Sequence, residues 1–351
     1  MLDLISEPAL VALAGLAGGL LLGLAARMGR FCTLGAIEDV YYGENTLRLR
    51  MWGIAIGVAV MGTFGLSAAG LLELDETLYL SQHWNPLGSV AGGMVFGYGM
   101  ALAGNCGYGA LARVGGGDLR SLLIVLIMGI SAYITLGGPL AGLRIWLFGG
   151  TEPASSAQSF AHALSSLSGL SVNLAGIIIG AVLFIGTLSH REMRRAPSYI
   201  IWGAVVGVAI VSGWAGTQWV ANNGYDATRI VSHTFSAPLG ETILYTMTSS
   251  GNSLSFGTGS VVGVVFGAFL GSLIKGHFRW EACEDPRELR RQILGAALMG
   301  IGAVVAVGCS VGQGMSAFSV LSYSAPVTLI SIMLGAAIGL RQLILGFGPE
   351  V

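Results

Sequence analysis

The sequence predicts an all-α polytopic membrane protein, and three observations support that fold class. Hydrophobic residues make up 54% of the 351 residues and charged residues only 10%, against roughly 25% charged in a soluble domain. The mean hydropathy of +0.75 implies more apolar surface than a soluble chain of this size can bury. Long apolar runs also recur along the whole chain. A nucleic-acid binder and an ordinary soluble enzyme are therefore excluded.

Nine apolar runs are close to the roughly 20 residues that a helix needs to cross a bilayer core. They lie at about 8–26, 51–72, 86–103, 119–140, 170–188, 199–213, 254–274, 291–308 and 326–345. Many contain glycines four residues apart, as at Gly263, Gly267 and Gly271, a spacing that lets helices approach closely in lipid. The chain begins with Asp3 and Glu7 rather than with basic residues, so we expect the first run to be retained as a span.

The basic residues predict an orientation. Fourteen of the 17 Lys and Arg fall in the odd-numbered connections between runs, and the even-numbered connections hold only Arg144 and Arg229. The positive-inside bias places the more basic connections in the cytoplasm. The N-terminus is therefore predicted to be periplasmic and the C-terminus cytoplasmic.

Three connections, at 29–37, 103–111 and 307–314, are too apolar to be exposed loops, and each contains the motif Cys-x-x-Gly. Each predicts a helix that breaks at glycine and continues as a short half-helix after the cysteine. Such irregular backbone is tolerated at membrane depth where protein or a water-filled cavity surrounds it. A fourth break, without a cysteine, is predicted at 213–216.

The junctions of Cys106 and Cys309 predict an internal repeat. Each is followed by a glycine-rich segment and then by a span containing Met128-Gly129 or Met333-Leu334-Gly335. Because one junction is predicted inside and the other outside, residues of about 8–140 and 199–345 are expected to be inverted copies. The run at about 170–188 would link them within one transport domain, 1–351. Inverted repeats with broken helices are typical of transport sites.

The junctions suit a small anion that has a soft sulfur of its own, such as thiosulfate. A half-helix N-terminus offers free N–H groups, glycines let them approach a ligand, and a neutral thiol adds a polarizable sulfur. The candidate relay residues are Cys32, Cys106 and Cys309. The candidate binding residues around them are Gly35, Asn105, Gly107, Gly109, Gly308, Gly312 and Gln313.

The cysteines have two other interpretations, as packing residues or as metal ligands. A cysteine in an apolar helix often packs as a small hydrophobe, and thiolates also bind soft metals. However, the five histidines lie in connections away from the three motifs. No acidic residue lies clearly within a run and no phosphate-binding loop occurs, so neither a carboxylate relay nor ATP hydrolysis is indicated. Cys283 lies among charged residues and is expected to be a surface thiol outside the path.

Three segments resemble the YeeE/YedE family: Gly29-Arg30-Phe31-Cys32, Gly104-Asn105-Cys106-Gly107, and the Gly-Cys-Ser-Val-Gly-Gln-Gly run at 308–314. The resemblance covers nearly the whole chain. It implies an hourglass of nine spans, with short broken helices that enter from both sides. It also implies thiosulfate uptake along a line of cysteines, which fall on Cys32, Cys106 and Cys309. A small TusA-like sulfur-carrier protein is implied as a cytoplasmic partner.

Together these features predict a bacterial inner-membrane importer of thiosulfate, or of a closely related sulfur anion, that performs no net chemistry and needs no cofactor. Two alternatives stay open. One is an importer of a selenium or other sulfur compound. The other is a membrane sulfurtransferase or redox enzyme that forms persulfides on Cys106 or Cys309.

Overall fold

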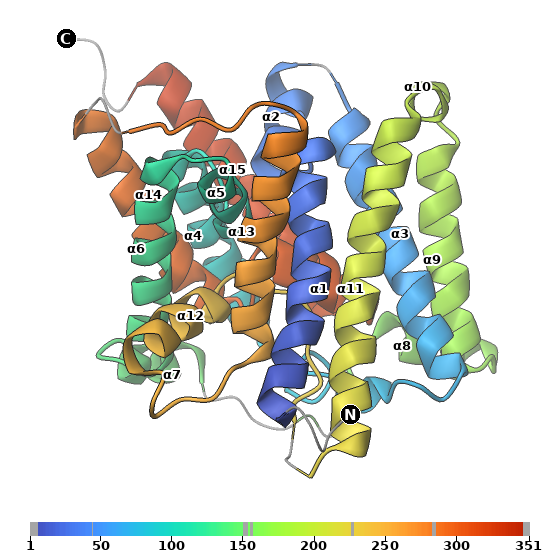
Figure 1. Cartoon of the computed structure of the whole chain (residues 1–351). Helices are drawn as coiled ribbons and strands as arrows, with labels where there is room; N and C mark the ends of the chain where they lie inside the picture. The colour runs from blue at the N-terminus through green and yellow to red at the C-terminus, as the bar shows by residue number, and fades with distance from the viewer. Residues whose placement is uncertain are drawn as a thin grey trace.

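The computed structural model describes residues 6–43, 45–149, 154, 157–225, 228–282 and 286–346, and in these residues it contains helices and no strand (Figure 1). The helices are α1 (Glu7–Met28), α2 (Thr33–Tyr42), α3 (Leu47–Ala68), η1 (Leu74–Glu76), α4 (Pro86–Ala103), α5 (Gly107–Gly115), α6 (Leu119–Leu136), α7 (Ala141–Phe148), α8 (Phe160–Ser168), α9 (Val172–Leu188), α10 (Arg191–Arg195), α11 (Pro197–Asn223), α12 (Ala237–Thr248), α13 (Phe256–Ile274), α14 (Pro286–Val305), η2 (Gly312–Ala317) and α15 (Ser324–Leu345).

All nine predicted apolar runs form helices, namely α1, α3, α4, α6, α9, α11, α13, α14 and α15. Within the described ranges, seven helical segments are long and apolar enough to cross a membrane, or eight if α8 and α9, bent by 114°, count as one span. Helix α14 has the length of a span, but its first turns contain Arg287 and Glu288. The polytopic all-α fold is confirmed.

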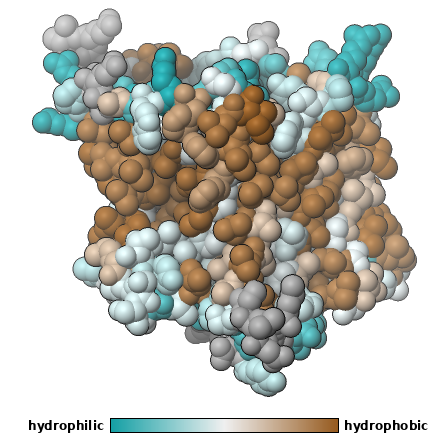
Figure 2. Space-filling model, viewed as in Figure 1, coloured by the Kyte–Doolittle hydropathy of each residue, from teal (hydrophilic) through white to brown (hydrophobic). Residues whose placement is uncertain are grey.

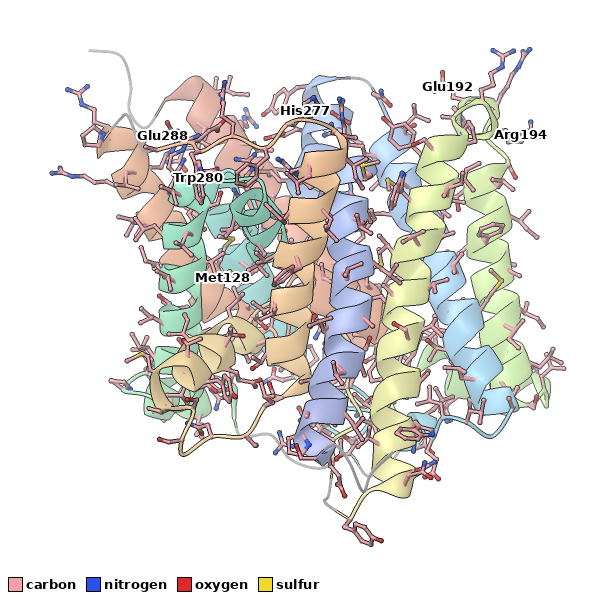
Figure 3. All side chains as sticks on the ribbon, in the orientation of Figure 1. Met128, Glu192, Arg194, His277, Trp280 and Glu288 are labelled. Atoms are coloured by element: carbon pink, nitrogen blue, oxygen red, sulfur yellow. The ribbon has the colours of Figure 1, made fainter. Side chains whose placement is uncertain are left out.

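The surface is that of a membrane protein. On the face shown in Figure 2, a band of hydrophobic side chains crosses the middle of the molecule, with more hydrophilic residues above and below it. On α9, Val182 and Ile185 remain 64% and 62% exposed, as expected for side chains that face lipid. In Figure 3, Glu192, Arg194, His277 and Glu288 lie at the same end of the molecule.

The two ends of the molecule differ in the connections that they hold. Helices α2, α5 and α10 lie at one end, which we call the basic end because it holds the predicted basic connections (Figure 1). The start of α1, with α7 and α8, lies at the other end, which we call the opposite end. Three of the predicted basic connections, those with α2, α5 and α10, thus lie at one end, and the connection with α7 and α8 lies at the other.

Glycines bring the spans into close contact, as predicted. Helix α13 packs along α1, where a Cβ atom on Gly263 or Gly267 would collide with the backbone carbonyls of Leu16 or Leu20. Helix α4 packs against both α14 and α15, and α3 packs against α9 and α11. Since apolar burial does not drive association within lipid, this close backbone contact is a main source of cohesion.

The chain breaks in the same register before each of the three junction cysteines, Cys32, Cys106 and Cys309. Arg30, Gly104 and Val307 have φ angles of 56°, 77° and 54°, and each lies two residues before its cysteine. A left-handed conformation costs a non-glycine residue roughly 1–2 kcal/mol. The strain at Arg30 and Val307 is therefore held by the packing around the junctions. The predicted half-helices at these positions are confirmed.

The predicted break at 213–216 is wrong. Helix α11 runs without interruption through this segment. Gly213 and Gly216 instead allow contact with Ser232 and Ala14, so they report close packing rather than a break. The chain leaves the helix only after Asn223, and the next half-helix, α12, begins after Ser236.

Candidate functional site

Each of the three cysteines caps the half-helix that follows it. The Sγ atoms of Cys32 and Cys106 are the N-caps of α2 and α5, and they accept hydrogen bonds from the N–H groups of Gly35 at 3.5 Å and Gly109 at 3.4 Å. The N–H of Gly312 donates to Cys309 at 3.4 Å in the same way. Serine and asparagine usually supply this cap through oxygen. The Cys-x-x-Gly motif therefore fixes one repeated geometry.

Cys309 has further donors from a segment that the sequence did not single out. The N–H of Phe235 donates to its Sγ at 3.2 Å, and the hydroxyl of Thr234 lies 3.7 Å away. This segment precedes α12 and ends at Ser236, so it forms a fourth junction. Its signal was present in the sequence as Phe235-Ser236 before a proline in the first helical turn, because serine followed closely by proline favours a helix start.

The three thiols lie near one another in the centre of the molecule. The thiol of Cys106 is within electrostatic reach of both Cys32 and Cys309. Cys106 and Cys309 are each 1% exposed, whereas Cys32 is partly exposed. Cys106 therefore neighbours both of the other thiols, and Cys32 is the one that lines a cavity.

Aromatic rings accompany this line of thiols. Phe31, which precedes Cys32, stacks on Trp52 at 4.8 Å between ring centroids and meets the edge of Tyr108 at 6.3 Å. Tyr108 in turn lies 5.5 Å from Phe235. The Tyr108 hydroxyl is occupied, since it donates to the carbonyl of Leu22 at 2.6 Å. The surroundings of the thiols are thus largely aromatic, with few polar groups.

A cavity of about 340 Å³ opens from Cys32 at the basic end, and we call it the Cys32 cavity. Of the predicted binding residues, Gly35, Asn105 and Gly109 line it. Its cationic lining residues are Arg27, Arg30, Arg48, Arg113 and Lys275. Glu38 also lines it, and Arg48 forms an ion pair with Asp39 at 3.2 Å. The excess of cations makes this cavity attractive to an anion.

A second cavity, of about 580 Å³, lies on the other side of the thiols, and we call it the Gly308 cavity. Val307 and Gly308 line it next to Cys309, together with Thr234. The two basic residues of the even-numbered connections, Arg144 and Arg229, both line it as well. Two carboxylates, Glu7 and Glu241, share the lining. Sequence reasoning missed this pairing because residues 85 positions apart meet only in the folded chain.

Two predicted binding residues, Gln313 and Gly107, have structural roles that the sequence did not reveal. The amide of Gln313 donates to the carbonyls of Ala306 at 2.9 Å and Val307 at 3.0 Å, and its oxygen accepts from Ser324 at 3.0 Å. Gln313 therefore ties down the end of α14. Gly107 leaves room where a Cβ atom would press on the sulfur of Met128 and the carbonyl of Phe235.

Asn105 behaves differently from Gln313. Its side chain is 2% exposed, and neither its Oδ1 nor its Nδ2 forms a hydrogen bond with a described residue. The described part of the chain contains no cluster of three or more His, Cys, Asp or Glu side chains that could hold a metal ion. Cys283, predicted to lie off the path, falls outside the described residues.

Comparison with known proteins agrees with this architecture. Residues 28–338 match the family profile described as sulphur transport. A thiosulfate transporter, TsuA, of Escherichia coli (strain K12) is 28% identical over 333 residues, which cover 92% of each chain. The thiosulfate transporter TsuA of Spirochaeta thermophila is 25% identical over 329 residues, covering 92% of this chain and 96% of that protein. The matched range contains all three thiol junctions, and the chain belongs to the sulphur-transport (YeeE/YedE) family of membrane proteins.

Proposed function

We propose that this protein imports thiosulfate, or a closely related sulfur anion, across the bacterial inner membrane through its line of thiols. The observation that carries the proposal is the position of Cys309, Cys106 and Cys32 between two cavities, one with an excess of cationic side chains and one lined by two arginines and two glutamates. Relatives that cover the full length of the path are named thiosulfate transporters. Sulfur-anion transport is the function of the family, and the substrate and the route are the proposal.

Capture takes place in the Gly308 cavity. Arg144 and Arg229 draw a dianion into it, while Glu7 and Glu241 keep the attraction moderate. The anion then meets Thr234 and the junction of Cys309. Because the cavity also has apolar walls, the charges act through a medium less polar than water and are effective at longer range.

Passage uses weak contacts with neutral thiols. In each junction a backbone N–H already donates to the sulfur, which leaves the S–H free to turn towards the substrate. Each contact is worth on the order of 1 kcal/mol, so the anion can leave as readily as it arrives. A thiolate would repel a dianion, so the relay requires the protonated form.

Release takes place in the Cys32 cavity on the cytoplasmic side. The positive-inside bias assigns the basic end, where this cavity opens, to the cytoplasm. Cys32 is the exposed member of the line, which suits transfer of the anion to a TusA-like carrier protein that docks there. Labelling of Ser189→Cys, in a Cys283→Ala background, tests this orientation. An impermeant reagent should fail to label it in intact cells, and ready labelling would reverse the assignment.

The proposed inverted repeat is supported by the way the helices pack. If α1, α3, α4 and α6 correspond to α11, α13, α14 and α15, each contact has a counterpart. The α1–α13 contact matches α11–α3, α4–α15 matches α14–α6, and α5–α13 matches η2–α3. Helix α2 then corresponds to α12, and Ser236 takes the place of Cys32. Helix α9 packs outside this scheme, as expected for a linker.

Uptake by purified protein in liposomes tests the proposal. Thiosulfate labelled in its sulfane sulfur and thiosulfate labelled in its sulfonate sulfur should enter at equal rates. The Cys32→Ala, Cys106→Ala, Cys309→Ala triple variant serves as the control. Uptake equal to that of empty liposomes would contradict the proposal.

The same experiment separates the second candidate, a sulfurtransferase. The sulfur of Cys309 receives two backbone N–H bonds, an arrangement that also stabilises a thiolate nucleophile. Such an enzyme would transfer the sulfane sulfur to the cysteine and release sulfite. The two labels would then separate, and mass spectrometry would find a persulfide on Cys106 or Cys309.

A further inference from the structure

Two polar side chains beside the central thiols are buried and lack a well-aligned hydrogen bond among the described residues, and Ser310 has only the Cys106 thiol beside its hydroxyl. Asn105, directly before Cys106, is 2% exposed, and neither its oxygen nor its nitrogen is bonded. Ser310, directly after Cys309, is fully buried, and its Oγ forms no well-aligned hydrogen bond. The Ser310 hydroxyl also lies beside the Cys106 thiol. Both groups therefore flank the middle member of the line.

Several other buried polar groups near the junctions do have partners in the protein. Ser316 donates to the carbonyl of His233 at 2.6 Å, and Ser319 accepts from the indole of Trp214 at 2.8 Å. The side-chain amide of Gln313 is bonded through both its nitrogen and its oxygen. A buried polar group without a partner is costly, so the amide of Asn105 and the hydroxyl of Ser310, each next to a junction cysteine in the sequence, point to a ligand.

We propose, on the basis of the proposed function, that Asn105 and Ser310 bind the sulfonate oxygens of thiosulfate while the thiol of Cys106 contacts its sulfane sulfur. The amide of Asn105 supplies two N–H donors and the serine hydroxyl supplies one. The three groups thus match the two chemically different ends of a single anion. We call them the Cys106 station.

The station makes the path selective where the cavities are not. Cations in the Cys32 and Gly308 cavities attract any small anion. At the station, sulfate would satisfy the amide and the hydroxyl but would offer the thiol no soft partner. Hydrosulfide would satisfy the thiol and leave both donors unpaired, which a buried site penalises strongly. Since none of the three groups needs a formal charge, an anion bound there can still move on.

The test uses Ser310→Ala and Asn105→Ala in liposomes, with Ser331→Ala as the matched control. Ser331 is a similarly buried serine on α15, and its hydroxyl donates to the carbonyl of Val327 at 2.8 Å. We expect each station variant to raise the KM for thiosulfate about 5- to 20-fold, which corresponds to the loss of one or two hydrogen bonds. The control should keep its KM.

Thermal stability provides a readout that a purely structural role would not give. Removing an unpaired hydroxyl should leave the melting temperature of Ser310→Ala unchanged or raised, whereas Ser331→Ala loses a hydrogen bond and should melt earlier. Stabilisation by added thiosulfate should shrink in the station variants only. A second pattern concerns sulfate as a competitor. Ser310→Ala should weaken the binding of thiosulfate and of sulfate by the same factor, whereas Cys106→Ala should weaken the binding of thiosulfate alone.

The outcomes separate the two proposals. If the wild-type protein fails to take up thiosulfate, the proposed function falls. If it transports and both station variants keep the wild-type KM within twofold, the Cys106 station is overturned. A melting temperature of Ser310→Ala that drops as far as that of Ser331→Ala would overturn it too. Should Asn105→Ala fail to fold, Asn105→Ser keeps one donor, and its KM should fall between the wild-type value and that of Ser310→Ala.

Discussion

The junctions of Cys32 and Cys309 share the motif Cys-x-x-Gly and the same cap geometry, yet their surroundings differ. The sulfur of Cys309 is 1% exposed and receives N–H groups from both Gly312 and Phe235. The sulfur of Cys32 receives a single N–H, from Gly35, and is partly exposed in a cavity with five cations. The local sequence therefore fixes the cap, while partners from distant segments decide how firmly each thiol is held.

The largest expected effect comes from removing the thiols. Cys309→Ala deprives two buried N–H donors of their acceptor, whereas Cys32→Ala deprives one at the edge of a cavity. We expect uptake of labelled thiosulfate to fall about 10- to 100-fold for Cys309→Ala and several-fold for Cys32→Ala. Serine in place of either cysteine should not restore uptake, since its hydroxyl oxygen is a harder, less polarizable atom than sulfur.

Cys106→Ala sharpens this comparison. The repeat relation predicts that Cys106 and Cys309 behave alike, whereas the additional Phe235 donor predicts a larger loss at Cys309. Growth on thiosulfate as sole sulfur source, in cells without other importers, ranks the three variants. Normal growth and uptake for all three Cys→Ala variants would leave the cysteines as packing residues only.

The next effect concerns Gly312 and Gly35, whose N–H groups donate hydrogen bonds to the capping cysteines of the two junctions. A Cβ atom on Gly312 would press on the side chain of Thr234 and the hydroxyl of Tyr79, both held in the packed centre. A Cβ atom on Gly35 would meet only the end of the Arg48 side chain, which can move. We expect Gly312→Ala to lower uptake more than tenfold and Gly35→Ala to lower it less than threefold. Equal losses would contradict the difference in rigidity between the two junctions.

Much of this arrangement could be predicted from the sequence because it is local. A cysteine before a glycine-rich turn specifies a cap within four residues, and apolar runs specify spans. The junction at Thr234-Phe235-Ser236 was missed because the glycines at 213–216 looked like a helix break, although packing keeps α11 intact there. Gln313 was predicted to bind the substrate, and its amide can both donate and accept hydrogen bonds. The same property lets it bond to Ala306, Val307 and Ser324 in the structure. Both interpretations depend on tertiary neighbours.

The cavities could not be predicted at all, because their lining comes from distant parts of the chain. Arg144 and Arg229 were visible in the sequence only as exceptions to the positive-inside bias. Likewise, Ser310 lies beside the thiol of Cys106, although the two residues are more than 200 positions apart in the sequence. Pair contacts of this kind depend on how α4 and α14 pack, and no local pattern records that packing.

A smaller effect separates the two cavities by their charges. Arg144→Gln should raise the KM for entry about three- to fivefold and weaken its dependence on salt, because the guanidinium steers the anion. Arg144→Lys keeps the charge and should stay near the wild-type value. Arg113→Gln, in the Cys32 cavity, should leave entry unchanged in liposomes of defined orientation. A higher KM for Arg113→Gln alone would indicate that the anion enters from the other side.

The smallest effect concerns the strained backbone before Cys309, compared with the relaxed glycine before Cys106. Val307 has a φ of 54° and Gly104 a φ of 77°, at the same position relative to their cysteines. Val307→Gly should therefore remove strain of about 1–2 kcal/mol, offset in part by the greater freedom of glycine in the unfolded chain. We expect a rise in melting temperature of a few degrees or none, with uptake unchanged. Gly104→Val introduces the same strain without the surroundings that evolved to hold it, and it should lower the melting temperature clearly. If Val307→Gly instead lowered uptake at undiminished stability, the strain at Val307 would be part of how the Gly308 cavity admits the anion to Cys309.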